Sequence, residues 1–263
     1  MIRSALMNVM TAAAIKAGRG LKRDFGEVEN LQVSLKGPGD FVSAADRKAE
    51  KVVFEELSRA RPGYGFLMEE QGVVEGSDKS HRWLVDPLDG TTNFLHGLPI
   101  FAVSIALERE GQLVAGVIYN PATDDMFMAE RGQGAWYNNH RMRVAARQKL
   151  SDAMIACGIP HLGRAAEHPR FKAELAAAMA RAGNVRRLGA AALDLALVAA
   201  GRLDGYWERG LSPWDMGAGI ILVREAGGFV NDADGGAEMI DKGSICVGNE
   251  TIQRELLALL RSA

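Results

Sequence analysis

The chain has 263 residues, of which 48% are hydrophobic and 24% are charged, a usual composition for a globular protein. Its 31 basic and 33 acidic residues give a formal net charge of −2, which excludes the basic excess that drives direct nucleic-acid binding. No apolar run is long enough for a membrane span, and Asn8, Thr11 and Lys16 interrupt the pattern of a targeting peptide. We therefore expect a cytoplasmic protein that does not contact membranes.

Two amphipathic helices are predicted at the start of the chain. Within residues 1–25, apolar side chains recur at helical spacing: Leu6, Met10, Ala13, Ala17 and Leu21. The second helix is expected over residues 43–60, where Ser43 is a suitable N-cap and Asp46 follows three positions later. Between the helices, the segment Leu35-Lys36-Gly37-Pro38-Gly39-Asp40 contains the residues that are typical of a mobile loop.

The stretch from Gly65 to Trp136 has the pattern of strands. Short runs rich in β-branched and aromatic residues occur at 83–85, 101–107 and 114–119, with turn residues between them. Such a meander indicates a largely antiparallel sheet, and we expect the first two helices to pack on one of its faces.

Strands and helices alternate from about residue 150 onwards. Strands are expected at 153–156 and 203–208, and helices at 165–180, 189–200, 214–226 and 250–261. The pattern predicts an α/β (α+β) protein with two lobes, residues 1–145 and 146–263. Cys157 and Cys246 lie apart in apolar stretches, which favours two buried free thiols over a disulfide or a zinc site.

The most informative segment is Asp86-Pro87-Leu88-Asp89-Gly90-Thr91-Thr92. A buried strand ends at Asp86, Pro87 stops strand pairing, and Gly90-Thr91-Thr92 resembles the start of a helix. Two carboxylates at a strand end suit a hard cation such as Mg²⁺, and the N–H groups of a helix start suit a phosphate. An Asx-turn with an N-cap explains most isolated Asp-x-x-Asp pairs, and for this segment alone that interpretation stays open.

Two further acidic positions favour the metal site. Glu69-Glu70 ends another apolar run, and Asp215 stands at the start of an apolar helix in Pro213-Trp214-Asp215-Met216-Gly217-Ala218-Gly219. Clustered carboxylates repel one another unless a bound cation offsets the repulsion.

These motifs, in this order, resemble the inositol monophosphatase family of lithium-sensitive, magnesium-dependent phosphatases, including its bacterial, SuhB-type branch. The segment from Asp86 to Thr91 resembles the first family signature, and the segment from Trp214 to Gly219 resembles the second. The resemblance covers nearly the whole chain. It implies a layered α-β-α-β-α sandwich, commonly a homodimer, and hydrolysis of a small phosphate ester such as myo-inositol 1-phosphate.

The resemblance also implies a role for individual residues. Two or three Mg²⁺ ions would be held per site, with ligands from Glu69, Asp86, the Leu88 carbonyl, Asp89 and Asp215. Glu70 would reach a metal through water, and Thr91, supported by Asp46, would orient the attacking water. The phosphate and the alcohol would be bound by Asp89, Gly90, Thr91, Gly189, Ala190, Ala191 and Glu208. Lys36 and Asp40 would belong to a mobile loop beside the site.

Two alternatives remain open from the sequence. The first is the same chemistry on another substrate: histidinol phosphate, fructose 1,6-bisphosphate or adenosine 3′,5′-bisphosphate. The second is partnership with RNA polymerase in transcription antitermination, a role of some bacterial family members. The local basic cluster of Arg181, Arg186 and Arg187 would suit such an interface, although a basic stretch of this kind is more often simply solvated.

Overall fold

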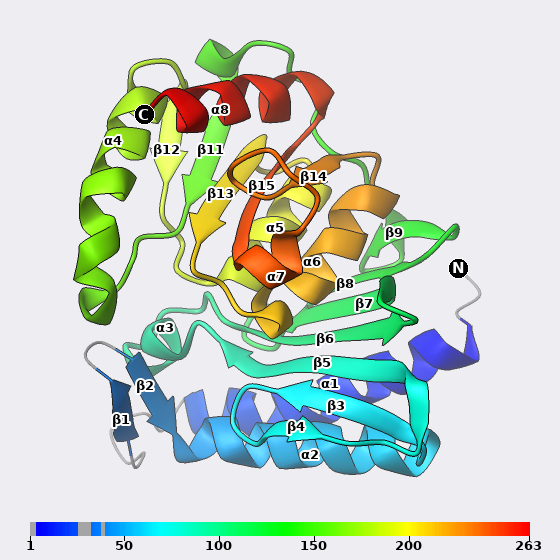
Figure 1. The fold of residues 1–263 in the computed structure, drawn as a ribbon. Coiled ribbons are helices and arrows are strands. Elements are labelled where there is room, and N and C mark those ends of the chain that lie inside the picture. Colours follow the sequence, from blue (N-terminus) through cyan, green and yellow to red (C-terminus); the bar gives the residue numbers. More distant parts are fainter. Residues whose placement is uncertain (1–3, 26–32, 38–39) are drawn as a thin grey trace.

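A computed structural model of the protein describes residues 4–25, 33–37 and 40–263, and two long helices open the chain (Figure 1). α1 (Ala5–Phe25) and α2 (Ala44–Ala60) confirm the two predicted amphipathic helices. Each buries one apolar face, for example through Met10 and Leu21 of α1 and Val53 of α2.

The larger sheet contains, within the described residues, eight strands in the order β10-β9-β8-β7-β6-β5-β3-β4. Neighbouring strands are antiparallel except β3 and β5, which run parallel. α1 and α2 pack on one face of the sheet and α6 packs on the other (Figure 1), which confirms the predicted arrangement. The strands are β3 (Tyr64–Met68), β4 (Gly72–Val74), β5 (Asp78–Asp89), β6 (Ala102–Arg109), β7 (Gln112–Asn120), β8 (Asp125–Glu130), β9 (Gly134–Tyr137) and β10 (His140–Arg141).

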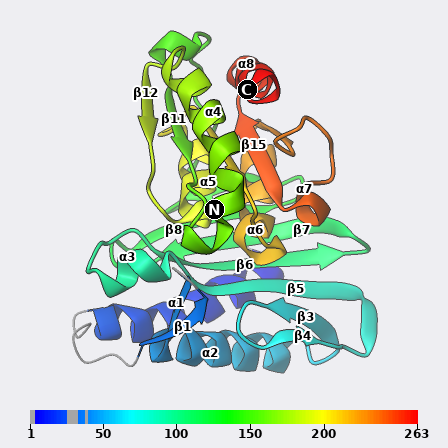
Figure 2. The same ribbon diagram turned by 60° about the vertical axis from the view of Figure 1, so that its left-hand side comes forward.

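The smaller sheet has five strands in the described part of the chain, in the order β12-β11-β13-β15-β14. They are β11 (Met154–Cys157), β12 (Asn184–Arg186), β13 (Gly205–Arg209), β14 (Phe229–Asn231) and β15 (Ser244–Gly248). α5 (Ala191–Ala199) and α6 (Pro213–Glu225) lie between the two sheets, and α4 (His168–Met179) and α8 (Glu250–Ser262) cover the outer face (Figures 1 and 2). The result is the α-β-α-β-α layering that the resemblance implied.

One hydrophobic core joins the two halves of the chain. Leu84 of the larger sheet, Leu195 of α5 and Ile221 of α6 belong to the same cluster. α6 approaches the larger sheet and α5 closely because it carries glycines. A Cβ atom at Gly217 would lie 2.8 Å from Leu84 of the sheet, and one at Gly219 would lie 2.3 Å from Leu195 of α5. The core therefore crosses the lobe boundary predicted near residue 145, and that division remains a prediction.

The segment predicted as a loop before α2 contains a hairpin. β1 (Val33–Gly37) pairs antiparallel with β2 (Asp40–Ser43), so Lys36 and Asp40 lie in strands, while Pro38 and Gly39 lie outside the described residues. The described residues therefore form strands where a mobile loop was expected, while the mobility of this segment remains a prediction. The glycines and proline dominated that prediction, although the β-branched and aromatic residues on either side favour strands.

Other differences are smaller. The helix predicted at 165–180 divides into a 3₁₀ turn, η3 (Leu162–Glu167), and α4, which begins at His168 with a proline in its first turn. Short elements that we did not predict are η2 (Leu150–Asp152), β12, β14, α7 (Met239–Lys242) and β15. Cys157 and Cys246 are buried free thiols, as predicted. None of the described helices combines the length and the apolar character needed to cross a bilayer.

Candidate active site

β5 brings two carboxylates to the end of the larger sheet through a turn that interrupts strand pairing. Its pairing with β6 is irregular between Asp86 and Asp89, where Pro87 has no N–H group to donate. The Oδ1 atom of Asp86 accepts a hydrogen bond from the Leu88 N–H at 2.9 Å, which fixes the turn. The Asx-turn that the sequence left open as an alternative to the metal site is therefore present, and it places both acids at one end of the strand.

Gly90 completes the turn and precedes α3 (Thr91–Leu95), the helix predicted at this position. Its φ angle is +89°, and a Cβ atom there would lie 2.8 Å from the Ile100 carbonyl oxygen. Both the backbone conformation and the lack of space require glycine. Asp89, Gly90 and Thr91 consequently line one cavity.

The Thr91 hydroxyl connects this turn to α2. Its Oγ1 atom lies 2.9 Å from Oδ1 of Asp46 and 3.0 Å from the Leu88 carbonyl oxygen, both of which are acceptors. Asp46 is completely buried in the first turn of α2. Because the hydroxyl donates its hydrogen inwards, its lone pairs stay available to accept a hydrogen bond from a water in the cavity.

Glu69 reaches the same place from β3. β3 and β5 are parallel, so they end at the same edge of the sheet. Glu69 follows β3 directly, and its N–H group donates to the Val85 carbonyl oxygen at 3.2 Å. The carboxylate of Glu69 therefore lies close enough to Asp86 for their repulsion to raise the pKa of Asp86.

The second half of the chain supplies Asp215 at the start of α6. Its Oδ2 atom accepts a hydrogen bond from the Ser212 N–H at 2.7 Å, as part of a capping box. Asp89, in the first half of the chain, is also linked to the second half. Its two carboxylate oxygens accept hydrogen bonds from the N–H groups of Ala191 at 3.2 Å and Ala192 at 2.7 Å. The Asp89 bonds hold the end of β5 to the start of α5.

Burial and mutual repulsion make these carboxylates unusually basic. Burial raises the pKa of Asp86 well above its ordinary value, and the charges of Glu69, Asp89 and Asp215 raise it further. Burial, reinforced by Glu208 and Glu69, raises the pKa of Asp89 to about 7 despite its two amide hydrogen bonds. Burial and the Asp89 charge raise the pKa of Asp215 to about 8. The site holds more negative charge than the protein around it stabilises.

Glu208 lines the same cavity from the end of β13. It accepts a hydrogen bond from the Tyr206 hydroxyl, and burial raises its pKa to about 7 although this hydrogen bond lowers it. Gly158 leaves room for the carboxylate, since a Cβ atom there would lie 1.7 Å from the Glu208 Cδ atom. The cavity has a volume of about 390 Å³ and is also lined by Arg164 and Arg187, which suits a small polar ligand.

The donor set fits a divalent metal ion. Buried carboxylate oxygens with pKa values raised by one another are the hard ligands that Mg²⁺ prefers, and a cation would remove their repulsion. No three His, Cys, Asp or Glu side chains within the described ranges already surround one metal position. Asp86, Asp89 and Asp215 each accept hydrogen bonds from backbone N–H groups. They also lie close enough for their charges to raise the pKa of Asp86 and of Asp215.

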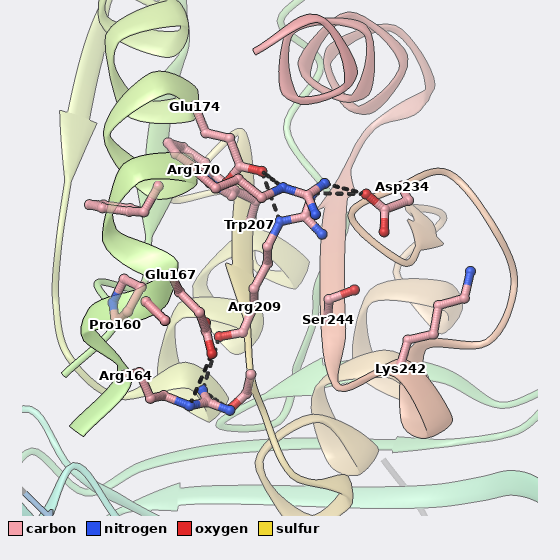
Figure 3. Close-up of a pocket in the computed structure, with 14 residues that line it drawn as sticks. Pro160, Arg164, Glu167, Arg170, Glu174, Trp207, Arg209, Asp234, Lys242 and Ser244 are labelled. Carbon is pink, nitrogen blue, oxygen red and sulfur yellow. Dashed lines mark hydrogen bonds and ion pairs between the residues drawn. The ribbon is translucent and has the colours of Figure 1, made fainter. Parts of the chain in front are cut away.

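A second cavity, of about 530 Å³, lies on the other side of the β13 end and shares Arg164 and Arg209 with the first. Four charged side chains form a closed network at its rim (Figure 3). Buried Glu174 accepts hydrogen bonds from Arg209 at 2.8 Å and from Arg170 at 3.2 Å. Asp234 accepts from the same two arginines, at 3.0 Å and 2.6 Å. Every carboxylate of this network has a cationic partner.

Most site residues that the sequence indicated lie around the first cavity. Its lining includes Glu69, Asp89, Gly90, Thr91, Gly189, Ala191, Glu208 and Asp215. Asp46, Asp86 and Ala190 are buried next to it, Glu70 is half-buried beside Glu69, and the Ala191 N–H donates to Asp89. The side chains of Lys36 and Asp40 lie outside the described part of the structure. The sequence did not indicate Arg164, which reaches the cavity only through the folding of the chain. It also did not indicate Ser212 and Tyr206, although both contact site residues that are near in the chain, Asp215 and Glu208.

Comparison with known proteins agrees with this geometry. The sequence pattern described as "Inositol monophosphatase family" matches residues 3–263. A protein of Mesorhizobium japonicum named inositol-1-monophosphatase is 68% identical over 261 residues, which cover 99% of this chain and 98% of that protein. A protein of Escherichia coli named Nus factor SuhB is 40% identical over 258 residues, covering 97% of this chain and 96% of that protein.

A solved structure shows the same fold. The crystal structure of the extragenic suppressor protein suhB from Bartonella henselae has a TM-score of 0.96 and 60% sequence identity to this chain. The match covers 99% of this chain and 100% of that one.

Proposed function

The chain belongs to the inositol monophosphatase family, and from that premise we propose that it hydrolyses myo-inositol 1-phosphate to inositol and phosphate. The observation that carries the proposal is the convergence of Glu69, Asp86, Asp89 and Asp215 beside the Thr91–Asp46 hydrogen bond. This arrangement supplies both metal ligands and a polar group that can orient a water molecule.

The metals are proposed to be Mg²⁺. Glu69, Asp86 and the Leu88 carbonyl would hold one ion, and Asp86, Asp89 and Asp215 a second, while a third, weaker ion would lie near Glu69. When bound, the ions lower the pKa of water and neutralise charge on the phosphate and on the leaving oxygen. Their binding would also remove the repulsion that raises the pKa of Asp86.

The protein itself would orient the nucleophile. Thr91 donates its hydroxyl hydrogen to Asp46, which leaves the hydroxyl oxygen to accept a hydrogen bond from the attacking water. Asp46 is the base behind Thr91, because a threonine alone is too weak a base. Attack on phosphorus breaks the bond to the alcohol oxygen, and the products are the free alcohol and inorganic phosphate.

The other groups would bind the substrate. The N–H groups of Gly90 and Thr91, at the start of α3, would hold phosphate oxygens. Glu208, which lines the same cavity, would accept hydrogen bonds from the substrate hydroxyls. The cavity volume of about 390 Å³ suits a small polyol.

The experiment that tests this proposal is a panel of phosphomonoesters assayed with Mg²⁺. Hydrolysis of inositol 1-phosphate should exceed that of histidinol phosphate, fructose 1,6-bisphosphate and adenosine 3′,5′-bisphosphate. Activity should disappear in chelator, and both Li⁺ and excess Mg²⁺ should inhibit. Full activity in chelator would refute the metal mechanism, whereas insensitivity to Li⁺ would refute only the inhibition.

A second candidate function is association with RNA polymerase in transcription antitermination, which does not exclude catalysis by the same protein. It is favoured by the 40% identity to the protein named Nus factor SuhB and by the exposed side chains of Arg181, Arg186 and Arg187. Pull-down of purified polymerase by the wild type, compared with a variant carrying alanine at these three positions, tests it. Light scattering tests the proposed homodimer separately.

A further inference from the structure

Glu50 lies one helical turn after Asp46 on α2 and takes no part in the chemistry proposed above. Its side chain is nevertheless buried at the metal-binding end of the sheet, with 1% of the residue exposed. Its Oε2 atom accepts a hydrogen bond from the Glu70 N–H at 2.8 Å, and its Oε1 atom accepts one from the Gln71 N–H at 3.0 Å. Both carboxylate oxygens are therefore engaged with one turn, Glu69–Gln71, between β3 and β4.

This placement is electrostatically unfavourable. Burial raises the pKa of Glu50, and the nearby carboxylates of Glu70 and Glu69 raise it further, while the two amide hydrogen bonds lower it. A neutral acceptor such as glutamine or a water would satisfy one amide without adding a charge. A carboxylate satisfies two adjacent N–H groups at once and so fixes the orientation of both peptide groups.

The turn that Glu50 holds is the one that carries Glu69. The Glu69 N–H is bonded to Val85 of β5, and the next two N–H groups are bonded to Glu50. Three successive amides of the turn are thus fixed, which sets the direction in which the Glu69 side chain leaves the backbone.

We propose that Glu50 is a positioning residue for metal binding, which holds the Glu69–Gln71 turn so that Glu69 faces Asp86. α2 then supports the site twice from the same face, because residues four apart on a helix are neighbours: Asp46 acts through Thr91, and Glu50 acts through the turn. The inference rests on the proposed function in one respect, the assignment of Glu69 as a metal ligand.

The test compares Mg²⁺ binding by the wild type, Glu50→Gln and Glu50→Asp, measured by calorimetry without substrate. Both variants should bind Mg²⁺ about 10- to 100-fold more weakly, as expected for the loss of a group that orients a ligand. Turnover at saturating Mg²⁺ should stay within about threefold of the wild type, since the proposed mechanism gives Glu50 no contact with the substrate or the attacking water. The matched control is Glu56→Gln, which removes a carboxylate that pairs with Lys16 and Arg59 at the surface of the same helix.

The outcomes separate this inference from the proposed function. Folded variants with wild-type Mg²⁺ affinity would show that Glu50 is only structural. A wild-type protein that binds no Mg²⁺ would overturn the proposed function together with this inference. Where neither variant folds, amide hydrogen exchange of the wild type decides: the N–H groups of Glu70 and Gln71 should exchange slowly although they lie in a turn, and rapid exchange would contradict the proposal.

Discussion

The two cavities that meet at the end of β13 treat carboxylates in opposite ways: one pairs a buried and an exposed carboxylate with arginines, and the other gathers buried carboxylates together. In the cavity shown in Figure 3, Glu174 and Asp234 accept hydrogen bonds from two arginines. In the candidate active site, Asp86, Asp89 and Asp215 accept hydrogen bonds from backbone N–H groups, which are neutral. In the first arrangement, arginines of the protein neutralise the carboxylates. In the second, the negative charge remains available to bind a ligand.

This contrast distinguishes structural acids from functional ones better than burial does. The charge of a buried carboxylate with a guanidinium partner is compensated within the protein, and removing either partner leaves the other unpaired. A group of buried carboxylates that mainly raise one another's pKa is a signature of a binding or catalytic site. The predictions below test whether the two cavities differ in this way.

The largest effect is expected for Asp86→Asn. Asp86 is the one side chain assigned to both metals, so its replacement should lower kcat by at least ~10²-fold, as for a lost transition-state electrostatic contact. The metal-free variant should be no less stable than the wild type, because one of the mutually repelling charges is gone. Steady-state kinetics and thermal unfolding in chelator measure the two effects.

The control for Asp86→Asn is Asp232→Asn. Asp232 is buried and pairs with Lys242 at 2.9 Å, far from the proposed chemistry. This variant should lose stability and keep its turnover. Near-normal turnover of folded Asp86→Asn would refute the site assignment.

Glu174→Gln should have the opposite consequence. It leaves Arg170 and Arg209 with one carboxylate between them, and we expect a loss of about 2–4 kcal/mol in the free energy of unfolding. The kcat of the folded enzyme should change less than about threefold, since the network holds no reacting group. Urea unfolding and kinetics on the same preparation measure both. A stable variant with impaired turnover would show that the paired cavity also serves the reaction.

A smaller effect is expected for Glu208→Ala. Glu208 is proposed to accept hydrogen bonds from substrate hydroxyls, so its loss should cost about 1–3 kcal/mol in kcat/KM towards inositol phosphate. An aryl ester without hydroxyls, p-nitrophenyl phosphate, should lose much less. Equal losses on both substrates would mean that Glu208 is structural or linked to the metals.

A further difference is expected in the pH dependence of stability. The pKa of Asp89 and of Glu208 is raised to about 7, and that of Asp215 to about 8, mainly by burial. Between pH ~4 and ~8 the folded state thus binds more protons at these groups than the unfolded state, so they make stability fall as pH rises.

Asp234, which is paired with two arginines, works in the other direction. Burial raises the pKa of Asp234, but hydrogen bonds from Arg209 and Arg170 outweigh it and leave the pKa lowered, so its contribution is lost on acidification. Metal-free protein should therefore lose thermal stability from pH 5 to pH 8, and Mg²⁺ should largely abolish that loss. A melting temperature that rises over this range in chelator would contradict the assignment.

The sequence was sufficient for the local parts of the site. The Asp86–Thr91 turn depends on a proline, a glycine and two acids that are close together in the chain. The proline removes an N–H donor, and the glycine permits a positive φ angle. The same holds for Asp215, because a helix start is visible from its capping residues and apolar run.

The sequence was insufficient where partners are distant. Glu50 looks like one of many charged residues on an amphipathic helix, and its two hydrogen bonds join positions about twenty residues apart. The network of Glu174, Arg209 and Asp234 brings together a helix, a strand and a loop that no local pattern connects. The hairpin before α2 was missed because glycine and proline are common both in hairpins and in open loops.

Gly158 limits how proteins with this fold can change. A Cβ atom at this position would occupy the place of the Glu208 carboxyl group, so the two sites cannot be altered independently. A descendant that gained any side chain at 158 would displace the acid at the recognition wall, and one that lost the acid would open a space that a larger residue at 158 would fill. New substrate preferences at this wall should therefore arise through paired substitutions, with the first step being costly until the second has occurred.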